Sequence, residues 1–348
     1  MNGDKTVSPG ESVTMSGGTV VVKVQSDRPH RRSNLGSLIL LGLLAASVMM
    51  NLLLTAGSVM TDLNTGSIRQ IHRGGTVGAS DKLAVIQVTG TIMPPFTDRW
   101  IKQIRDVVED DAVKGVLLEI DSPGGLVADS HQLYHELQKL RAVKPVYVAM
   151  KRMAASGGYY IAMGAGPNAQ VFAEPTTWTG SIGVILPRYN AAELASKIGV
   201  RSEPLVTGPL KGSLSPFRDL REDELLVWEA IIDDSFRRFR SVIADNRSNL
   251  NAADVEALAT GQVFTAAQAL ENGLIDQTGF TDDAITALAN SLGLSEYEVV
   301  DYASPVGLIN LLLGRLESPP NLMDQLMDAG VPRAFYYCSW HPVIPGKP

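Results

Sequence analysis

The sequence predicts an α/β fold with a mainly parallel sheet, preceded by one transmembrane helix. Two observations support this prediction. Apolar β-type runs alternate with amphipathic helical patterns, which is the signature of βαβ units in a parallel sheet. Ahead of them, residues 35–60 contain no charged residue and are long enough to cross a bilayer. The alternation starts at Leu83, so we expect the folded domain to occupy residues 81–300.

Length and composition limit what the chain can be. Its 348 residues are 45% hydrophobic, which is enough for a packed core, and its net charge is −7. An acidic chain without a sustained block of Lys and Arg does not favour a nucleic-acid partner. The single cysteine, Cys338, excludes an intramolecular disulfide. We predict no cofactor and no metal.

The segments before the domain differ sharply in polarity. Residues 1–34 are rich in small polar and basic residues, and we expect a cytoplasmic tail. Residues 35–60 are predicted to be an uncleaved anchor, because the polar segment before them and the apolar run itself are longer than in a secretory signal. More basic residues precede the run than follow it closely, so the positive-inside rule places the N-terminus in the cytoplasm. Residues 61–80 are polar and are predicted to be a linker.

Strands and helices alternate within the predicted domain. Strands are expected at four apolar runs, 83–88, 116–120, 146–150 and 170–173. Helices are expected at 100–110, 127–140, 222–246, 253–258, 266–272 and 282–292. The aromatic and aliphatic stripe of 222–246 indicates core packing or a subunit interface. Residues 301–348 are predicted to be a tail with a short apolar helix after Pro305, too short to span a membrane.

Two glycine-rich turns are the main functional signal. Asp121-Ser-Pro-Gly-Gly125 and Met153-Ala-Ala-Ser-Gly-Gly158 each follow a β-type run, at the strand ends where parallel sheets bind ligands. The second turn places Ser156 at a strand-to-helix corner, although serine is also a preferred helix N-cap. The first turn offers backbone N–H groups for negative charge developing on a substrate carbonyl. The pair predicts a serine nucleophile beside an oxyanion hole.

A serine nucleophile needs a base. His131 and His135 are the histidines of the predicted domain, and their spacing puts both on one helical face. A zinc site is not favoured, because His131 is not followed by Glu and no third ligand has useful spacing; a role for His131 near the site stays open. A lysine can act as base if burial lowers its pKa. Lys211, in a charge-poor loop, is a better candidate than Lys151 or Lys197.

Residues 83 to about 290 resemble the signal peptide peptidase A family in its half-length form. Members of this family are membrane-anchored serine proteases of the Clp/crotonase fold with a Ser/Lys dyad. The matching segments, in chain order, are 121–125, 153–160, 179–184, the loop around Lys211, 273–276 with Gly279, and 283–285. Each glycine motif occurs once, as expected for a single protease repeat.

The resemblance implies a repeated ββα superhelix and assigns roles to individual residues. Ser156 would be the nucleophile and Lys211 the general base. Gly125 and Gly157 would supply the oxyanion N–H groups, with Gly124 in support.

Ser181 would hold the lysine amine or serve as a structural turn serine. The resemblance also implies a ring-shaped homo-oligomer, in which neighbouring protomers can complete each other's dyad. It places the chain in the cytoplasmic membrane of a bacterium, with the protease domain outside the cytoplasm.

Three functions compete. The leading hypothesis is an endopeptidase that cleaves hydrophobic peptides, such as remnant signal peptides, through an acyl-enzyme on Ser156. A crotonase-type enzyme would instead bind coenzyme A thioesters and stabilise their enolates. A membrane-bound scaffold would keep the fold for peptide binding without turnover.

Overall fold

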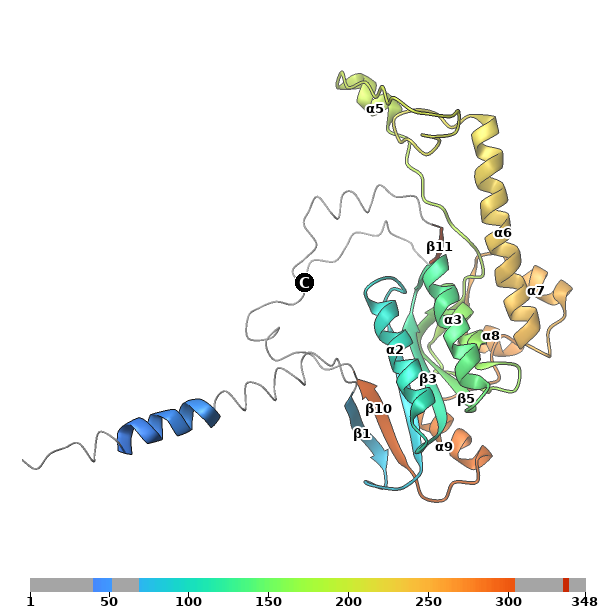
Figure 1. Cartoon of the computed structure of the whole chain (residues 1–348). Helices are drawn as coiled ribbons and strands as arrows, with labels where there is room; N and C mark the ends of the chain where they lie inside the picture. The colour runs from blue at the N-terminus through green and yellow to red at the C-terminus, as the bar shows by residue number, and fades with distance from the viewer. Residues whose placement is uncertain (1–39, 52–68, 304–333, 338–348) are drawn as a thin grey trace, which may run out of the picture. The chain divides into compact units, whose positions relative to one another are not determined.

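The computed structural model describes residues 40–51, 69–303 and 334–337 (Figure 1). The chain divides into two units, Met1–Asn64 and Thr65–Pro348. The second unit holds the α/β domain.

In the first unit, residues 40–51 form a helix inside the predicted anchor 35–60. Within the ranges that the structure describes, no helix combines the length and the apolar character needed to cross a bilayer. The rest of that predicted anchor lies outside the described residues. So do the predicted tail 1–34 and the apolar segment that follows Pro305.

A mixed, mainly parallel sheet forms the domain, in the order β1-β10-β2-β3-β5-β6-β9, with β7 joining β5 to β8. Its strands are β1 (Arg69–Gly75), β2 (Lys82–Thr89), β3 (Val113–Ser122), β5 (Val146–Ala155), β6 (Val171–Ala173), β7 (Trp178–Gly180), β8 (Val263–Thr265), β9 (Gln277–Thr278) and β10 (Glu298–Ala303). The pairs β1–β10 and β7–β8 are antiparallel, and the other pairs of this sheet are parallel. The predicted α/β fold with a mainly parallel sheet is confirmed.

Helices cover both faces of the sheet. Successive side chains of a strand point to opposite faces, and both faces of the buried strands carry apolar residues. Ala84 and Ile86 of β2 belong to a large core that includes residues of α2, α3 and α4, whereas Leu83 and Val85 pack in a second core with α9. The helices of the domain are α2 (Phe96–Glu109), α3 (Val127–Arg141), α4 (Gly157–Ala162), α5 (Ala192–Lys197), α6 (Glu222–Asn246), α7 (Ala252–Leu258), α8 (Ala266–Glu271) and α9 (Thr281–Ser291).

The two halves of α6 have different surroundings. Near its C-terminal end Phe239 and Ile243 are fully buried in the large core. In the N-terminal half Leu226 is 67% exposed and Ile231 is 44% exposed. This half extends away from the sheet together with the segment that contains α5 (Figure 1). The predicted core packing therefore holds for only the C-terminal half of this helix in a single chain.

Several strands lie where the sequence predicts none, and three of them come from the two ends of the described domain. β1 falls inside the expected linker 61–80, and β10 ends beyond residue 300. Only one residue of β1, Ile71, is a large hydrophobic residue, so an exposed edge strand of this kind has no apolar alternation to detect. The third, β11 (Phe335–Tyr337), forms a separate two-stranded sheet with β4 (Gly124–Leu126).

Candidate active site

Ser156 lies at the corner between β5 and α4, as the sequence predicts. Its φ of 54° and ψ of −115° are unusual for a residue with a side chain and cost on the order of 1–3 kcal/mol. Two backbone hydrogen bonds hold this conformation: the Ser156 N–H donates to the Gly180 carbonyl at 2.7 Å, and the Tyr160 N–H donates to the Ser156 carbonyl at 2.8 Å. The Ser156 side chain makes no capping hydrogen bond to α4. Helix capping therefore does not explain this serine, and a strained strand-to-helix corner is typical of nucleophiles.

The Gly124-Gly125 turn lies directly beside the start of α4. A Cβ atom on Gly124 would lie 2.6 Å from the Gly157 amide nitrogen, and one on Gly157 would lie 3.0 Å from the Gly125 amide nitrogen. Gly124 also has a φ of 97°, which favours glycine. A Cβ on Gly125 would meet the Ile92 carbonyl oxygen at 1.9 Å. These glycines therefore let two backbone segments approach each other next to Ser156.

Strand β11 lies beside these turns, between β4 and Ile185. One edge of β11 pairs antiparallel with β4, and the Val127 N–H donates to the Ala334 carbonyl at 3.1 Å. On the other edge, the Phe335 N–H donates to the Ile185 carbonyl at 2.9 Å, and the Ile185 N–H donates to the Phe335 carbonyl at 3.0 Å. The segment is thus held along both edges, as an added strand is in β-augmentation.

The carbonyl group of Tyr336 lies at the two glycine turns. Hydrogen-bonded pairs alternate along an antiparallel ladder, so the bond at Ala334 makes Gly125 and Tyr336 the next bonded pair. The Tyr336 carbonyl oxygen is 2.1 Å from the position of a Cβ on Gly124 and 3.0 Å from that of a Cβ on Gly157. A peptide carbonyl therefore sits where the sequence predicts the oxyanion hole.

The Tyr336 side chain fills an aromatic pocket made by α4 and α6. Its ring stacks on Tyr160 with centroids 4.9 Å apart and packs against Phe239 at 4.7 Å. Its hydroxyl donates to the Ser235 carbonyl at 2.7 Å. Burial raises the pKa of the Tyr336 phenol and also that of Tyr160, so both side chains are neutral at physiological pH.

His131 of α3 lies behind this pocket. Its Nδ1 atom is 2.7 Å from the Tyr160 hydroxyl, and its ring stacks on Tyr134 with centroids 5.9 Å apart. Burial, with smaller contributions from Arg238 and His135, lowers the pKa of His131 below the ordinary 6.5. His131 thus supports the pocket wall as a mainly neutral imidazole.

Ser181 directly follows Gly180, whose carbonyl accepts the hydrogen bond of the Ser156 N–H. Its φ is 51°, its side chain is largely buried, and its N–H donates to the Gln262 carbonyl at 2.7 Å. Gly180, which accepts the hydrogen bond of the Ser156 N–H, is the last residue of β7. The two strained serines are therefore coupled through a single peptide unit.

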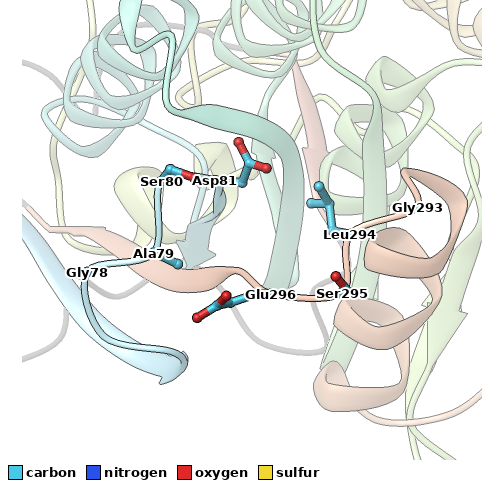
Figure 2. A pocket seen from close by; sticks show the side chains of 8 residues that line it. All are labelled: Gly78, Ala79, Ser80, Asp81, Gly293, Leu294, Ser295 and Glu296. Carbon is cyan, nitrogen blue, oxygen red and sulfur yellow. The ribbon is translucent and has the colours of Figure 1, made fainter.

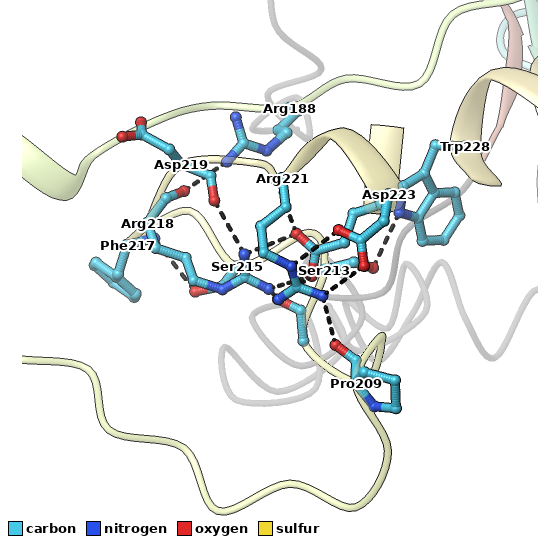
Figure 3. A network of polar contacts seen from close by, with 12 residues as sticks. Arg188, Pro209, Ser213, Ser215, Phe217, Arg218, Asp219, Arg221, Asp223 and Trp228 are labelled. Carbon is cyan, nitrogen blue, oxygen red and sulfur yellow. Dashed lines mark hydrogen bonds and ion pairs between the residues drawn. The ribbon is translucent and has the colours of Figure 1, made fainter. Parts of the chain in front are cut away.

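Lys211 lies on an exposed loop. A network of polar contacts holds this loop near the start of α6, and Figure 3 shows it with Pro209 and Arg221. The Arg221 guanidinium donates to the Pro209 carbonyl at 2.8 Å, and Arg218 donates to the Gly212 carbonyl at 2.8 Å. These contacts lie on both sides of Lys211. They set its position relative to the N-terminal end of α6.

Glu224 anchors the two arginines. Its carboxylate, which has no exposed surface, lies 2.6 Å from Arg218 and 3.1 Å from Arg221. The hydrogen bond from Arg218, above other causes, lowers the pKa of Glu224 to about 2. From Glu224 to Phe239, beside the Tyr336 pocket, α6 rises roughly 22 Å. The structure therefore does not bring Lys211 to Ser156 within one chain.

A hollow of about 470 Å³ lies elsewhere, between residues 78–81 and 293–296 (Figure 2). These segments precede β2 and β10, so the hollow is at the amino ends of parallel strands. Ser156 and the Gly124-Gly125 turn follow the carboxyl ends of β5 and β3. The hollow in Figure 2 therefore lies at the opposite end of the strands from the candidate site.

The sequence pattern does not reveal the residues that form the pocket and fill it. Tyr160 stands in the recognised motif around Ser156, but nothing in that motif indicates a pocket wall. The sequence predicts Phe239 only as one member of the helical stripe of residues 222–246. Tyr336 lies in a short segment without periodicity, and only its pairing with β4 reveals its place.

The chain matches two protein-family models and several individual relatives. Residues 138–295 match the model of peptidase family S49, and residues 76–179 match that of Clp protease. The chain is 39% identical over 204 residues to an Enterococcus faecium protein named as signal peptide peptidase SppA, covering 58% of each chain. It is 36% identical over 269 residues to a Synechocystis protein named as a protease, covering 77% of this chain and 94% of that one.

A third relative is the chloroplastic serine protease SPPA of Arabidopsis thaliana. It is 36% identical over 223 residues, which are 61% of this chain and 32% of the plant protein. The chain thus spans little more than half of the Enterococcus relative, a third of the plant one and nearly all of the Synechocystis one. Together with the strained serine and the glycine turns, these matches show that the chain belongs to peptidase family S49, a family of serine proteases.

Proposed function

We propose that the chain is a membrane-anchored endopeptidase in which Ser156 is the nucleophile and Lys211 the general base. Its substrates are hydrophobic peptides, such as remnant signal peptides, bound as a strand in the place of β11. The observation that carries this proposal is the Tyr336 carbonyl, which lies against Gly124 and Gly157 beside the strained Ser156. The anchor would be residues 35–60, with the N-terminus in the cytoplasm.

The proposed reaction follows from this geometry. The Ser156 hydroxyl attacks the carbonyl carbon of the bound peptide while a neutral Lys211 amine takes its proton. The Gly125 and Gly157 N–H groups stabilise the oxyanion, and Lys211 returns the proton to the leaving amine. Water then hydrolyses the ester on Ser156, again with Lys211 as the base. Ser181 would orient the lysine amine.

We further propose that Lys211 serves the Ser156 of a neighbouring protomer in a ring-shaped homo-oligomer. Lys211 is fixed to the N-terminal end of α6, far from Phe239 in its own chain. That end of α6 exposes apolar side chains, with Leu226 67% exposed and Ile231 44% exposed. Burying this face against a second copy supports both the assembly and the delivery of Lys211.

Mixed oligomers test the dyad and its arrangement together. Ser156→Ala and Lys211→Ala should each abolish hydrolysis of a hydrophobic peptide while the variants still fold and assemble. Lys197→Ala is the matched control, because Lys197 is an exposed lysine of the same projecting segment, paired only with Glu193. It should keep wild-type activity.

Co-expression of the two inactive variants then separates the two arrangements. If the dyad forms between protomers, random mixed rings should recover about a quarter of the wild-type activity, because a quarter of neighbouring pairs hold an intact Ser156 and Lys211. No recovery would place the dyad within one chain. Retained hydrolysis by Ser156→Ala alone, or by Lys211→Ala alone, would show that the residue concerned is not part of the dyad. A wild-type protein without hydrolysis or acylation would favour the scaffold function.

A further inference from the structure

We infer that Trp228 of α6 is a positioning residue of the active site, which sets the place of the base Lys211 through a hydrogen bond to Ser213. This inference rests on the proposed peptidase function, in which Lys211 takes the proton of Ser156. It adds a residue that acts through the loop of residues 208–215, called the Lys211 loop below.

Ser213 is the buried point of a long exposed segment. Every residue from 196 to 212 is exposed, whereas Ser213 is only 7% exposed. The Trp228 indole N–H donates to the Ser213 hydroxyl oxygen at 3.0 Å (Figure 3). An exposed segment takes its position from the places where it is bound to the rest of the protein. The bond from Trp228 therefore helps to place Lys211, which lies two residues before Ser213.

Two overlapping backbone turns connect Ser213 to Lys211. The Ser213 N–H donates to the Leu210 carbonyl at 3.2 Å, which closes a turn with Lys211 as its second residue. The Lys211 N–H donates to the Gly208 carbonyl at 3.3 Å and closes the turn before it. A displacement of Ser213 therefore moves the backbone of Lys211 with it.

The contact from Trp228 is separate from those of the two arginines. Arg218 and Arg221 hold carbonyl groups of the loop, and both are anchored on the carboxylate of Glu224. Trp228 lies four residues after Glu224 in α6, so its side chain leaves the same face of the helix one turn later. Its ring is rigid and has a single N–H donor, so the direction of the hydrogen bond is fixed. The loop is thus bound to α6 at two independent places.

The position of the loop matters because a general base must reach the proton that it takes. A lysine amine has to come within hydrogen-bond distance of the Ser156 hydroxyl, and a small misplacement is costly. The lysine side chain is long and flexible, so its backbone has to be held for the amine to return to one place. Loss of the Trp228 bond should therefore slow proton transfer without weakening the binding of the peptide.

Two substitutions in the full chain remove this bond from opposite sides. Trp228→Phe keeps an aromatic ring without the donor, and Ser213→Ala removes the acceptor. Each should lower kcat for a hydrophobic peptide about fivefold, because one hydrogen bond is lost, and leave KM unchanged. The double variant should be no more impaired than the weaker single variant, because both changes remove the same bond.

Ser215→Ala is the matched control. The Ser215 hydroxyl belongs to the same loop but accepts only the Phe217 N–H, at 3.3 Å, and makes no contact with α6 among the hydrogen bonds of the described residues. This variant should keep the wild-type kcat. Unchanged kcat in both Trp228→Phe and Ser213→Ala, or a change confined to KM, would overturn the inference.

Mixed rings show whether the lost activity is that of the lysine. Trp228→Phe chains are co-assembled with an about ninefold excess of Ser156→Ala chains, which carry an intact Lys211 loop. Activity per intact Ser156 should rise from about a fifth to about nine-tenths of the wild-type value, because about nine in ten neighbours then supply a well-placed lysine. Lys211→Ala in the same mixture is the reference and should recover to about the same level.

The mixture also separates failure of this inference from failure of the proposed function. Recovery of Lys211→Ala without recovery of Trp228→Phe would place the defect of Trp228→Phe outside the Lys211 loop. That result would overturn the inference and leave the proposed function intact. A wild-type chain without hydrolysis would overturn both.

Discussion

Replacing Gly157 by alanine tests whether a substrate carbonyl takes the place of the Tyr336 carbonyl. The added Cβ would lie 3.0 Å from that oxygen, closer than an ordinary contact, so a substrate oxygen would have to move away from the Gly125 and Gly157 amides. Weakening one oxyanion contact costs up to about 2.7–4 kcal/mol of transition-state stabilisation. We expect kcat/KM to fall by about 10²-fold, mostly through kcat.

The effect of this substitution on stability should be smaller. Alanine restricts the unfolded chain and stabilises by about 0.4–1 kcal/mol, whereas crowding against Ser130 Oγ, 2.6 Å from the new Cβ, costs about 1–3 kcal/mol. We therefore expect the free energy of unfolding, measured in urea, to fall by no more than about 2.6 kcal/mol. The variant should be folded at the temperature of the activity assay.

The double variant with Ser130→Ala is the control for crowding. The Ser130 hydroxyl is buried and has no hydrogen-bond partner among the described residues, so its removal relieves the contact at little cost. The contact of Ala at position 157 with the substrate oxygen remains. Stability should recover in the double variant and activity should not. Full activity in Gly157→Ala alone would refute the proposed position of the substrate carbonyl, and recovery in the double variant would assign the loss to packing.

Three further predictions concern the frame of the site. Gly125→Ala should destabilise by more than about 3 kcal/mol in thermal unfolding, because its Cβ would meet the Ile92 backbone oxygen at 1.9 Å; an unchanged Tm would contradict the close approach. Because the pKa of His131 is lowered in the folded chain, the unfolded chain binds a proton more readily, and the free energy of unfolding should fall as pH drops below 6.5. His131→Gln should flatten this fall in urea titrations between about pH 7 and pH 5. The pKa of Glu224 is lowered to about 2, so this carboxylate contributes stability above pH 4.5 that is lost as pH falls toward 2. Glu224→Gln should release the Lys211 loop and reduce peptide hydrolysis by about tenfold, with little change in the Tm of the core. Unchanged kinetics would show that this anchor does not matter for Lys211.

The sequence predicts those parts of the fold that local patterns determine. α6 begins and ends at the predicted residues, because a long periodic stripe and an acidic first turn mark a helix clearly. The buried strands β2, β3 and β5 each overlap a predicted apolar run. β1 has no such pattern, since its side chains are mostly exposed and its partner β10 is more than two hundred residues away in sequence.

The same distinction holds in the site. The Ser156 corner and the Gly124-Gly125 turn are local backbone features, and small residues mark them in the sequence. The place of Tyr336 depends on pairing with β4, a contact between distant parts of the chain that three residues of β11 cannot signal. The distance of Lys211 from Ser156 likewise depends on the direction in which α6 leaves the core, which the helical pattern does not contain.

One short strand connects the geometry of the nucleophile to the binding of the peptide. β7 pairs with the last residues of β5, and the Gly180 carbonyl at its end holds the strained Ser156 N–H. The chain continues through Ser181 to Ile185, which bonds to Phe335 on the outer edge of the bound strand. A peptide that pairs with Ile185 is therefore aligned by the same backbone segment that fixes Ser156. Because both contacts depend on β7, displacing this strand should impair peptide binding and the orientation of the nucleophile together.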